Sequence, residues 1–245
     1  MEPIIIIAIL ATFLFAAFLK GTAGLGFATT CLGVMASYLD MRVAIPLVII
    51  PSLLSNIMVM IDAGDFVPIT RRFWFLYVSA LPGLALGLWL LGDSDTTLPR
   101  AVLGSAMFLY GIWGLWGGQL TLSEKLWMAG PTGLVTGLVN GLTGSQVMPI
   151  LPYLMSLNLT KDELVQAINT SFTMASLVML VGLGKLGLFN AEIATISALG
   201  VIPAGVGIWL GGRVRRKLHE VVFRKIVLLL LAILGAGLIA KAILA

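Results

Sequence analysis

Two glycine-rich stretches, one in each half of the chain, combine residue types that could bind an anion. The first reads Lys20-Gly21-Thr22-Ala23-Gly24-Leu25-Gly26 and the second reads Asn140-Gly141-Leu142-Thr143-Gly144-Ser145-Gln146. Glycine lets a backbone come close to a ligand, and the hydroxyl groups of Thr22, Thr29, Thr143 and Ser145 can donate hydrogen bonds to oxygen atoms. The two stretches therefore predict an anion site, with tight helix packing as the alternative role of any single glycine.

Lys20 would supply the positive charge of such a site. A lysine buried at a bend within the membrane could offset the charge of a bound anion. A lysine whose long side chain snorkels to the membrane interface is the alternative, because the equivalent position holds the neutral Asn140. The sequence leaves both interpretations open.

Polar residues inside apolar segments extend the predicted site. Asn56 and Asn169 lie in the middle of two such segments, and Thr170 and Thr173 continue the second polar cluster. Amide groups at that depth need partners, which a neighbouring helix or a ligand can provide. The substrate-binding residues that we expect are Lys20, Gly21, Thr22, Gly24, Gly26, Thr29, Asn56, Asn140, Gly141, Thr143, Gly144, Ser145, Gln146, Asn169, Thr170 and Thr173.

The sequence lacks the side-chain groupings of an enzyme or of a metal site. No apolar segment contains a Ser/His, Cys/His or paired-carboxylate combination, and His219, the only histidine, lies in a basic loop. There is no Gly-Lys-Ser/Thr phosphate loop either. The net charge of +4 comes mainly from the loop at 213–225, which is typical of membrane topology rather than of nucleic-acid binding. We therefore expect no enzymatic activity, no cofactor, no metal and no nucleic-acid partner.

The composition is that of a protein surrounded by lipid. Hydrophobic residues make up 59% of the 245 residues and charged residues 11%, against about 25% charged in a soluble domain. Several apolar stretches approach the roughly 20 residues that cross a bilayer: 44–61, 73–91, 101–118, 164–183 and 221–244. Because backbone groups in lipid must be paired within their own segment, we expect helices. The sequence predicts an all-α, multi-pass membrane protein in contact with membrane lipid.

The two halves resemble each other. A shift of 120 positions aligns glycines and tryptophans without a gap: Gly21 with Gly141, Gly24 with Gly144, Gly64 with Gly184, Gly87 with Gly207, Trp89 with Trp209 and Gly92 with Gly212. Each half also has one long run broken by glycine, at 3–38 and 126–157, followed by three ordinary apolar spans. This layout indicates an internal repeat of residues 1–120 and 121–245 within one membrane domain.

Loop charges predict that the two repeats are inverted. Loops rich in Lys and Arg stay in the cytoplasm, so the basic loop at 213–225 is placed inside and its acidic counterpart at 93–100 outside. Equivalent loops on opposite sides require an odd number of crossings in each half. We therefore expect two inverted repeats, each a broken-helix hairpin plus three transmembrane helices, with parallel halves of eight crossings in all as the alternative. Broken helices in such a repeat place a substrate near the membrane midplane, around which alternating access occurs.

The order of motifs resembles the TauE/SafE family of sulfite exporters over nearly the whole chain. The resemblance lies in the two glycine-rich stretches, at 18–26 and 137–144, in Pro149 and Pro152 after the second stretch, and in the Asn169-Thr170-Ser171 cluster. It implies transport of sulfite or of an organosulfonate such as sulfoacetate or toluenesulfonate. The family's consecutive glycines are replaced here by bulkier residues, such as Leu25, Phe27 and Gln146, which favours an organosulfonate.

These expectations combine into one functional prediction. We expect a secondary permease of the bacterial cell inner membrane that carries a small anionic substrate, a sulfonate or sulfite, and whose sequence allows a homodimer. The alternative is a non-transporting membrane scaffold or subunit, in which the polar bends serve packing and bind no ligand.

Overall fold

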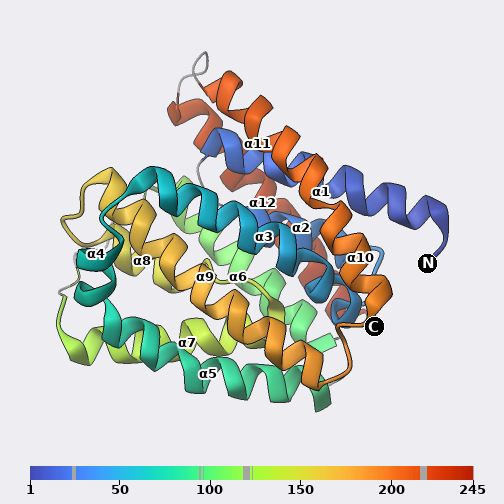
Figure 1. Ribbon diagram of the computed structural model, residues 1–245, viewed down its shortest axis with the longest axis horizontal. Coiled ribbons are helices and arrows are strands. Elements are labelled where there is room, and N and C mark those ends of the chain that lie inside the picture. The colour runs from blue at the N-terminus through green and yellow to red at the C-terminus, as the bar shows by residue number, and fades with distance from the viewer. Residues whose placement is uncertain are drawn as a thin grey trace.

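The protein is a bundle of helices in a computed structural model that describes residues 1–23, 26–93, 95, 97–117, 122, 124–215 and 220–244 (Figure 1). The first half contains α1 (Pro3–Ala23), α2 (Phe27–Met35), α3 (Met41–Ala63), α4 (Phe66–Arg72), α5 (Trp74–Asp93) and α6 (Thr97–Leu115). The second half contains α7 (Leu126–Thr143), α8 (Ile150–Met155), α9 (Lys161–Lys185), α10 (Ala191–Leu199), α11 (Val201–Arg215) and α12 (Glu220–Ile243). No strand occurs in these described ranges, which confirms the all-α prediction.

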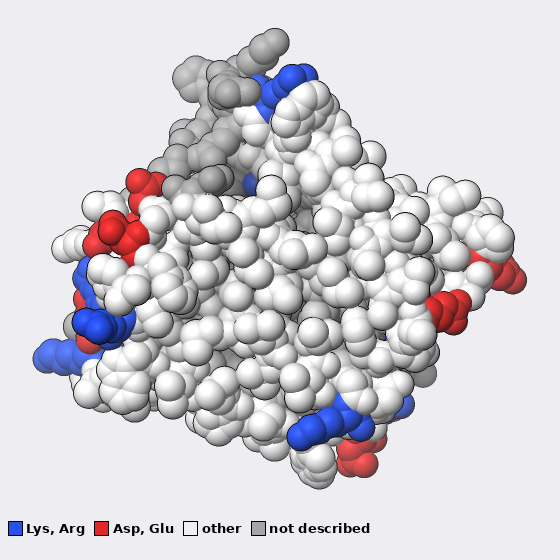
Figure 2. Space-filling model, in the orientation of Figure 1, with Lys and Arg blue, Asp and Glu red and all other residues white. Residues whose placement is uncertain are grey.

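Six segments within these helices are long and apolar enough to cross a bilayer. They are Pro3–Thr22, Met41–Ile61, Trp74–Asp93, Thr97–Leu115, Asp162–Lys185 and Ala191–Val214. Figure 2 shows a broad uncharged surface on the face in view, with Lys, Arg, Asp and Glu gathered toward its edges. Many large hydrophobic side chains of the described helices are also exposed, which suits contact with lipid, so the chain is a multi-pass membrane protein.

The two long apolar runs break at glycines, as predicted. In the first run α1 ends before Gly26, whose φ is +94°, and in the second run α7 ends at Gly144, whose φ is +73°. A residue with a side chain rarely adopts such angles. Each run is therefore a long helix followed by a short one: α1 and α7 have 21 and 18 residues, and α2 and α8 have 9 and 6.

The helices pair in a pattern that repeats when α1–α6 are matched in order with α7–α12. The most extensive contacts join α5 to α7, α1 to α11, α6 to α12 and α3 to α9. When each helix is replaced by its counterpart in the other half, the α5–α7 pair becomes the α11–α1 pair. The α6–α12 and α3–α9 pairs are unchanged by this replacement. Figure 1 shows the α5–α7 and α1–α11 pairs on opposite sides of α3 and α9. The opposite membrane orientation of the halves stays a prediction.

Glycines make the two outer helix pairs close-packed. A Cβ atom at Gly87 would lie 2.9 Å from the Gly141 Cα atom, and one at Gly211 would lie 2.9 Å from the Gly21 Cα atom. Real Cβ atoms essentially never come closer than 3.0 Å to such a neighbour. Gly21 and Gly141 thus allow backbones to touch at equivalent crossings, which is the packing role of small residues in membrane helices.

The central helices α3 and α9 begin at well-formed caps. Asp40 accepts a hydrogen bond from the Arg42 backbone N–H at 2.8 Å, and Thr160 forms a reciprocal capping box with Glu163. Such side chains satisfy backbone donors that the first helical turn leaves free. The caps fix where each helix starts and hence which of its faces points inward.

Proline changes α3 next to its polar residues. Pro51 has no N–H group, so the Leu47 carbonyl loses its ordinary helical donor. The Ser197 hydroxyl on α10 donates to that carbonyl at 2.7 Å instead. A contact from the second half therefore satisfies the α3 backbone about two turns before Ser55 and Asn56.

Candidate functional site

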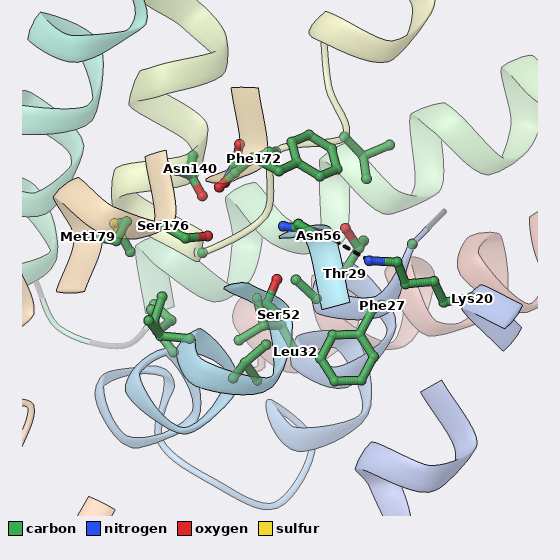
Figure 3. Close-up of a pocket in the computed structure, with 18 of the residues that line it drawn as sticks. Lys20, Phe27, Thr29, Leu32, Ser52, Asn56, Asn140, Phe172, Ser176 and Met179 are labelled. Atoms are coloured by element: carbon green, nitrogen blue, oxygen red, sulfur yellow. Dashed lines mark hydrogen bonds between the residues drawn. The ribbon is translucent and has the colours of Figure 1, made fainter. Parts of the chain in front are cut away.

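A cavity lies between the two halves, among the α1 end, α2, α3, the bend after α7, and α9 (Figure 3). Its polar lining comes from Lys20, Thr29, Ser52, Asn56, Asn140, Gln146, Asn169 and Ser176, and its apolar lining includes Phe27, Leu32, Phe172 and Met179. The cavity has a volume of about 30 Å³. One water molecule needs about 10–15 Å³, so the space suits a compact ligand.

Lys20 brings a basic group to this cavity. Its side chain is buried, and its Nζ atom donates to Ser55 Oγ at 2.9 Å and to Asn56 Oδ1 at 2.8 Å, both on α3. An ammonium group has three N–H donors, so these two contacts leave one for a ligand. Lys20 therefore lies buried within the protein and does not extend to the membrane interface. Among the described residues that line the cavity, no other side chain is ionisable.

Two amide nitrogens add further donors. Asn56 uses its Oδ1 atom to accept from Lys20, and its Nδ2 atom has no partner. Asn140, at the end of α7, also leaves its Nδ2 atom without a partner, although both side chains are almost fully buried. In the view of Figure 3, Asn56 lies between Lys20 and Asn140. A buried amide N–H without an acceptor costs free energy that a bound anion would recover.

The second half contributes acceptors to the same space. Asn169 on α9 donates through Nδ2 to the Val165 carbonyl at 2.8 Å, and its Oδ1 atom has no partner. Gln146, in the bend after α7, donates through Nε2 to the Phe172 carbonyl at 3.4 Å, and its Oε1 atom has no partner. The cavity therefore offers hydrogen-bond donors from one set of residues and hydrogen-bond acceptors from another.

The two bends meet beside the cavity. Thr29 Oγ1 on α2 and Ser145 Oγ in the second bend are 2.7 Å apart and share a hydrogen bond. Gly26 and Gly144, the positive-φ glycines of the two bends, both line the cavity. Thr29 and Ser145 are 116 residues apart in the sequence, so their contact joins the two bends in one site.

The structure brings half of the predicted site residues to the cavity wall. They are Lys20, Gly26, Thr29, Asn56, Asn140, Gly144, Gln146 and Asn169. Each comes from the broken-helix bends or from the middle of α3 and α9. Their binding of a substrate remains a prediction, which their convergence supports.

The other predicted site residues lie behind this wall or away from it. Gly21 and Gly141 pack at helix crossings, while Thr22 and Thr143 donate back to carbonyls of their own helices, Leu19 at 2.8 Å and Val139 at 2.7 Å. Ser145 is buried and reaches the cavity through Thr29.

Three predicted site residues remain, Thr170 and Thr173 on α9 and Gly24 in the first bend. Thr173 donates to the Met60 sulfur at 3.2 Å, and Thr170 has a buried hydroxyl without a partner. Neither is part of the cavity lining. Gly24 lies outside the described residues.

Sequence reasoning missed the serines of the site. Ser52 and Ser176 line the cavity, and Ser55 holds Lys20. A helical spacing could have found them, because Ser52, Ser55 and Asn56 lie at positions i, i+3 and i+4 of one helix face. Ser176 follows Asn169 by seven residues, which again places both on one face.

The polar groups of the cavity are amides, hydroxyls and the Lys20 amine. Among the described residues no group of three His, Cys, Asp or Glu side chains lies close enough to hold a metal ion. Amides, hydroxyls and an amine suit a small ligand with oxygen atoms.

Comparison with protein families identifies the family of the chain. The family described as "Sulfite exporter TauE/SafE" matches residues 9–238, which is nearly the whole chain and includes every residue of the cavity wall. No curated protein and no solved structure matched the chain in the same comparisons.

Proposed function

Because the chain belongs to the TauE/SafE family of sulfite exporters, we propose that it is a secondary permease for a small sulfur-containing anion and that the cavity around Lys20 is its binding site. Family membership makes the protein a membrane transporter. The substrate, the site and the mechanism are the proposal.

The observation that carries the proposal is the burial of the Lys20 amine among neutral groups. The Lys20 Nζ atom is bonded to the neutral Ser55 and Asn56, and of the described cavity residues none is acidic. A charge removed from water costs several kcal/mol unless an opposite charge compensates it. A bound anion would provide that compensation, and the free Nδ2 atoms of Asn56 and Asn140 would bond its oxygens.

The position of the cavity supports alternating access. Its walls come from both halves, with Lys20 and Asn56 on one side and Asn140 and Asn169 on the other. Movement of one half relative to the other would open the same site first to one face of the membrane and then to the opposite one. We also propose that the protein works by this mechanism in the bacterial inner membrane.

The size of the cavity favours a compact sulfur anion. A cavity of about 30 Å³, where one water molecule needs about 10–15 Å³, is closer in size to sulfite than to an arylsulfonate. The aryl group of toluenesulfonate would require the apolar wall at Phe27, Phe172 and Met179 to move apart. Sulfite is therefore the first substrate to test, followed by organosulfonates.

Ligand-dependent unfolding of the full-length protein in detergent tests the proposal. Sulfite, taurine, sulfoacetate, toluenesulfonate and sulfate are added separately, and the midpoint of thermal unfolding is recorded. A ligand present at about 100 times its Kd stabilises the folded state by about 2.7 kcal/mol, so a bound anion raises the midpoint. Counterflow of the stabilising anion in proteoliposomes then measures transport. If none of the anions raised the midpoint, the scaffold alternative would be supported instead.

A further inference from the structure

Two buried acceptor atoms in the cavity are not explained by binding of an anion as such. Asn169 Oδ1 and Gln146 Oε1 have no hydrogen-bond partner, and their side chains are 0% and 8% exposed. Both residues line the cavity. A carbonyl oxygen carries partial negative charge, so it repels the oxygens of a ligand that has only acceptors. These two atoms call for a hydrogen-bond donor on the ligand.

The hydrogen bond made by each amide nitrogen fixes the oxygen as the unpaired atom. Asn169 Nδ2 donates to the Val165 carbonyl at 2.8 Å, so turning the amide over would place two oxygens in contact. Gln146 is held in the same sense by its longer contact of 3.4 Å with the Phe172 carbonyl. The acceptors therefore cannot be exchanged for donors without losing a hydrogen bond.

The charge of the cavity points to the same kind of ligand. Lys20 is the ionisable side chain among the described lining residues. One positive charge balances a monoanion, whereas a dianion would leave a net negative charge buried, which is strongly unfavourable. Charge and acceptor placement are independent observations, and both disfavour a fully deprotonated dianion.

We propose that the cavity selects a compact oxyanion that carries a single negative charge and keeps a proton to donate, and that Asn169 and Gln146 are the residues that recognise this proton. The inference rests on the proposed function, because it specifies which anion the same cavity accepts. Hydrogensulfite has this chemistry: its charged oxygens face Lys20, Asn56 and Asn140, and its hydroxyl donates to Asn169 or Gln146. Sulfate and the sulfite dianion lack both features.

Three ligands of similar size separate charge from proton donation. Hydrogensulfite is a monoanion with a donor, methanesulfinate replaces its hydroxyl with a methyl group and keeps the charge, and sulfate is a dianion without a donor. Their dissociation constants are measured by calorimetry on the full-length protein in detergent, without oxygen. All are measured at one mildly acidic pH, at which hydrogensulfite predominates. We expect methanesulfinate and sulfate to bind about 10- to 100-fold more weakly than hydrogensulfite, because each leaves buried acceptors unpaired.

The variants Asn169→Leu and Gln146→Leu test the assigned residues. Each removes an acceptor while keeping a side chain of similar size, so hydrogensulfite should lose affinity and methanesulfinate should lose little or gain. The ratio of the two dissociation constants should therefore fall by about tenfold. Asn158→Leu makes the same chemical change at an exposed loop position and should leave the ratio unchanged. The unfolding midpoint without ligand identifies a variant that fails to fold, and the other variant then decides.

The outcomes distinguish this inference from the proposed function. Methanesulfinate binding as tightly as hydrogensulfite to the unaltered protein, with no change of ratio in either leucine variant, would overturn proton recognition and leave the anion site standing. No binding of any of the three ligands would overturn both. A ratio that falls in the Asn169 or Gln146 variant, and not in the Asn158 control, supports the proposal.

Discussion

The bends of the two halves have the same construction and different chemistry. Each ends a long helix, turns at a glycine of positive φ, at Gly26 or Gly144, and reaches the same cavity. At equivalent positions before the turn, the first bend has Lys20, which is bonded to α3, and the second has Asn140, whose Nδ2 atom is unpaired. The two bends thus contribute similar backbone geometry to the site and only the first contributes an amine, which agrees with the proposed binding of a monoanion.

Glycines show a second difference, within each bend. Gly21 and Gly141 lie where helices cross and backbones touch, whereas Gly26 and Gly144 turn the chain into the cavity. Glycines that lie close together in the sequence of one bend therefore have separate roles. Substitution of the first kind should change stability, and substitution of the second kind should change the shape of the site.

Of the four changes that test this comparison, replacement of Lys20 should have the largest effect, a loss of ligand affinity. Lys20→Met keeps the length of the side chain and leaves the acceptor Asn56 Oδ1 without its donor. Because the loss of one partner of a buried charge pair costs about 3–5 kcal/mol, the affinity for sulfite should fall by at least about 100-fold, measured by calorimetry. Lys241→Met is the matched control, since Lys241 is exposed and donates to the Ser37 carbonyl. Unchanged affinity in Lys20→Met would contradict the assignment of the site.

Moving the charge to the other bend sharpens the same test. The double variant Lys20→Asn, Asn140→Lys places the cation at the equivalent position of the second half. If the two bends are equivalent, it should recover part of the affinity that Lys20→Asn alone loses, on the order of tenfold. Recovery should be incomplete, because Ser55 and Asn56 lie on the side of Lys20.

Adding a methyl group at a helix crossing should have the next largest effect, and on stability. A Cβ atom at Gly211 would meet the backbone of α1 at Phe18 and Gly21, whereas one at Gly205 on the same helix has no neighbour within 4 Å. Gly211→Ala should therefore destabilise by about 1–3 kcal/mol through overpacking. Gly205→Ala should be neutral or stabilise by up to about 1 kcal/mol. Thermal unfolding in detergent compares them, and equal midpoints would argue against close packing at this crossing.

Breaking the hydrogen bond between the bends should have the smallest effect. Thr29→Val and Ser145→Ala each remove one of the two hydroxyls that lie 2.7 Å apart. A double-mutant cycle should give a coupling free energy of about 0.5–1.5 kcal/mol in unfolding. Additive single effects would mean that the contact does not join the bends energetically. Ser37→Ala, at an exposed hydroxyl that bonds the Val34 carbonyl, is the control.

Much of the fold could be predicted from the sequence because the bilayer constrains it strongly. Long apolar segments must be helical in lipid, and glycines mark the places where such a helix can turn. The breaks near Gly26 and Gly144 and the family itself follow from these patterns. The repeated pairing of α1 with α11 and of α5 with α7 is not visible in the sequence, because it depends on which helix faces meet.

The residue types of the candidate site could be predicted from the sequence, but only some of the individual residues could. Lys20, Asn56 and Asn169 stand out because polar residues are costly inside apolar segments. Thr22 and Thr143 stand out in the same way, yet their hydroxyls bond their own helices. A hydroxyl can satisfy itself locally by bonding a carbonyl one turn earlier, and sequence does not show which hydroxyls do so.

By itself the sequence determined that this protein is a helical membrane transporter with two glycine-broken runs and a lysine at one of them, because residue type and spacing limit what lipid allows. Only the tertiary structure decided that Lys20 is buried against Ser55 and Asn56 and faces Asn140 and Asn169 across one small cavity. It also decided which amide atoms are paired. The physical reason is that burial and hydrogen bonding depend on contacts between segments more than 100 residues apart, such as Thr29 and Ser145.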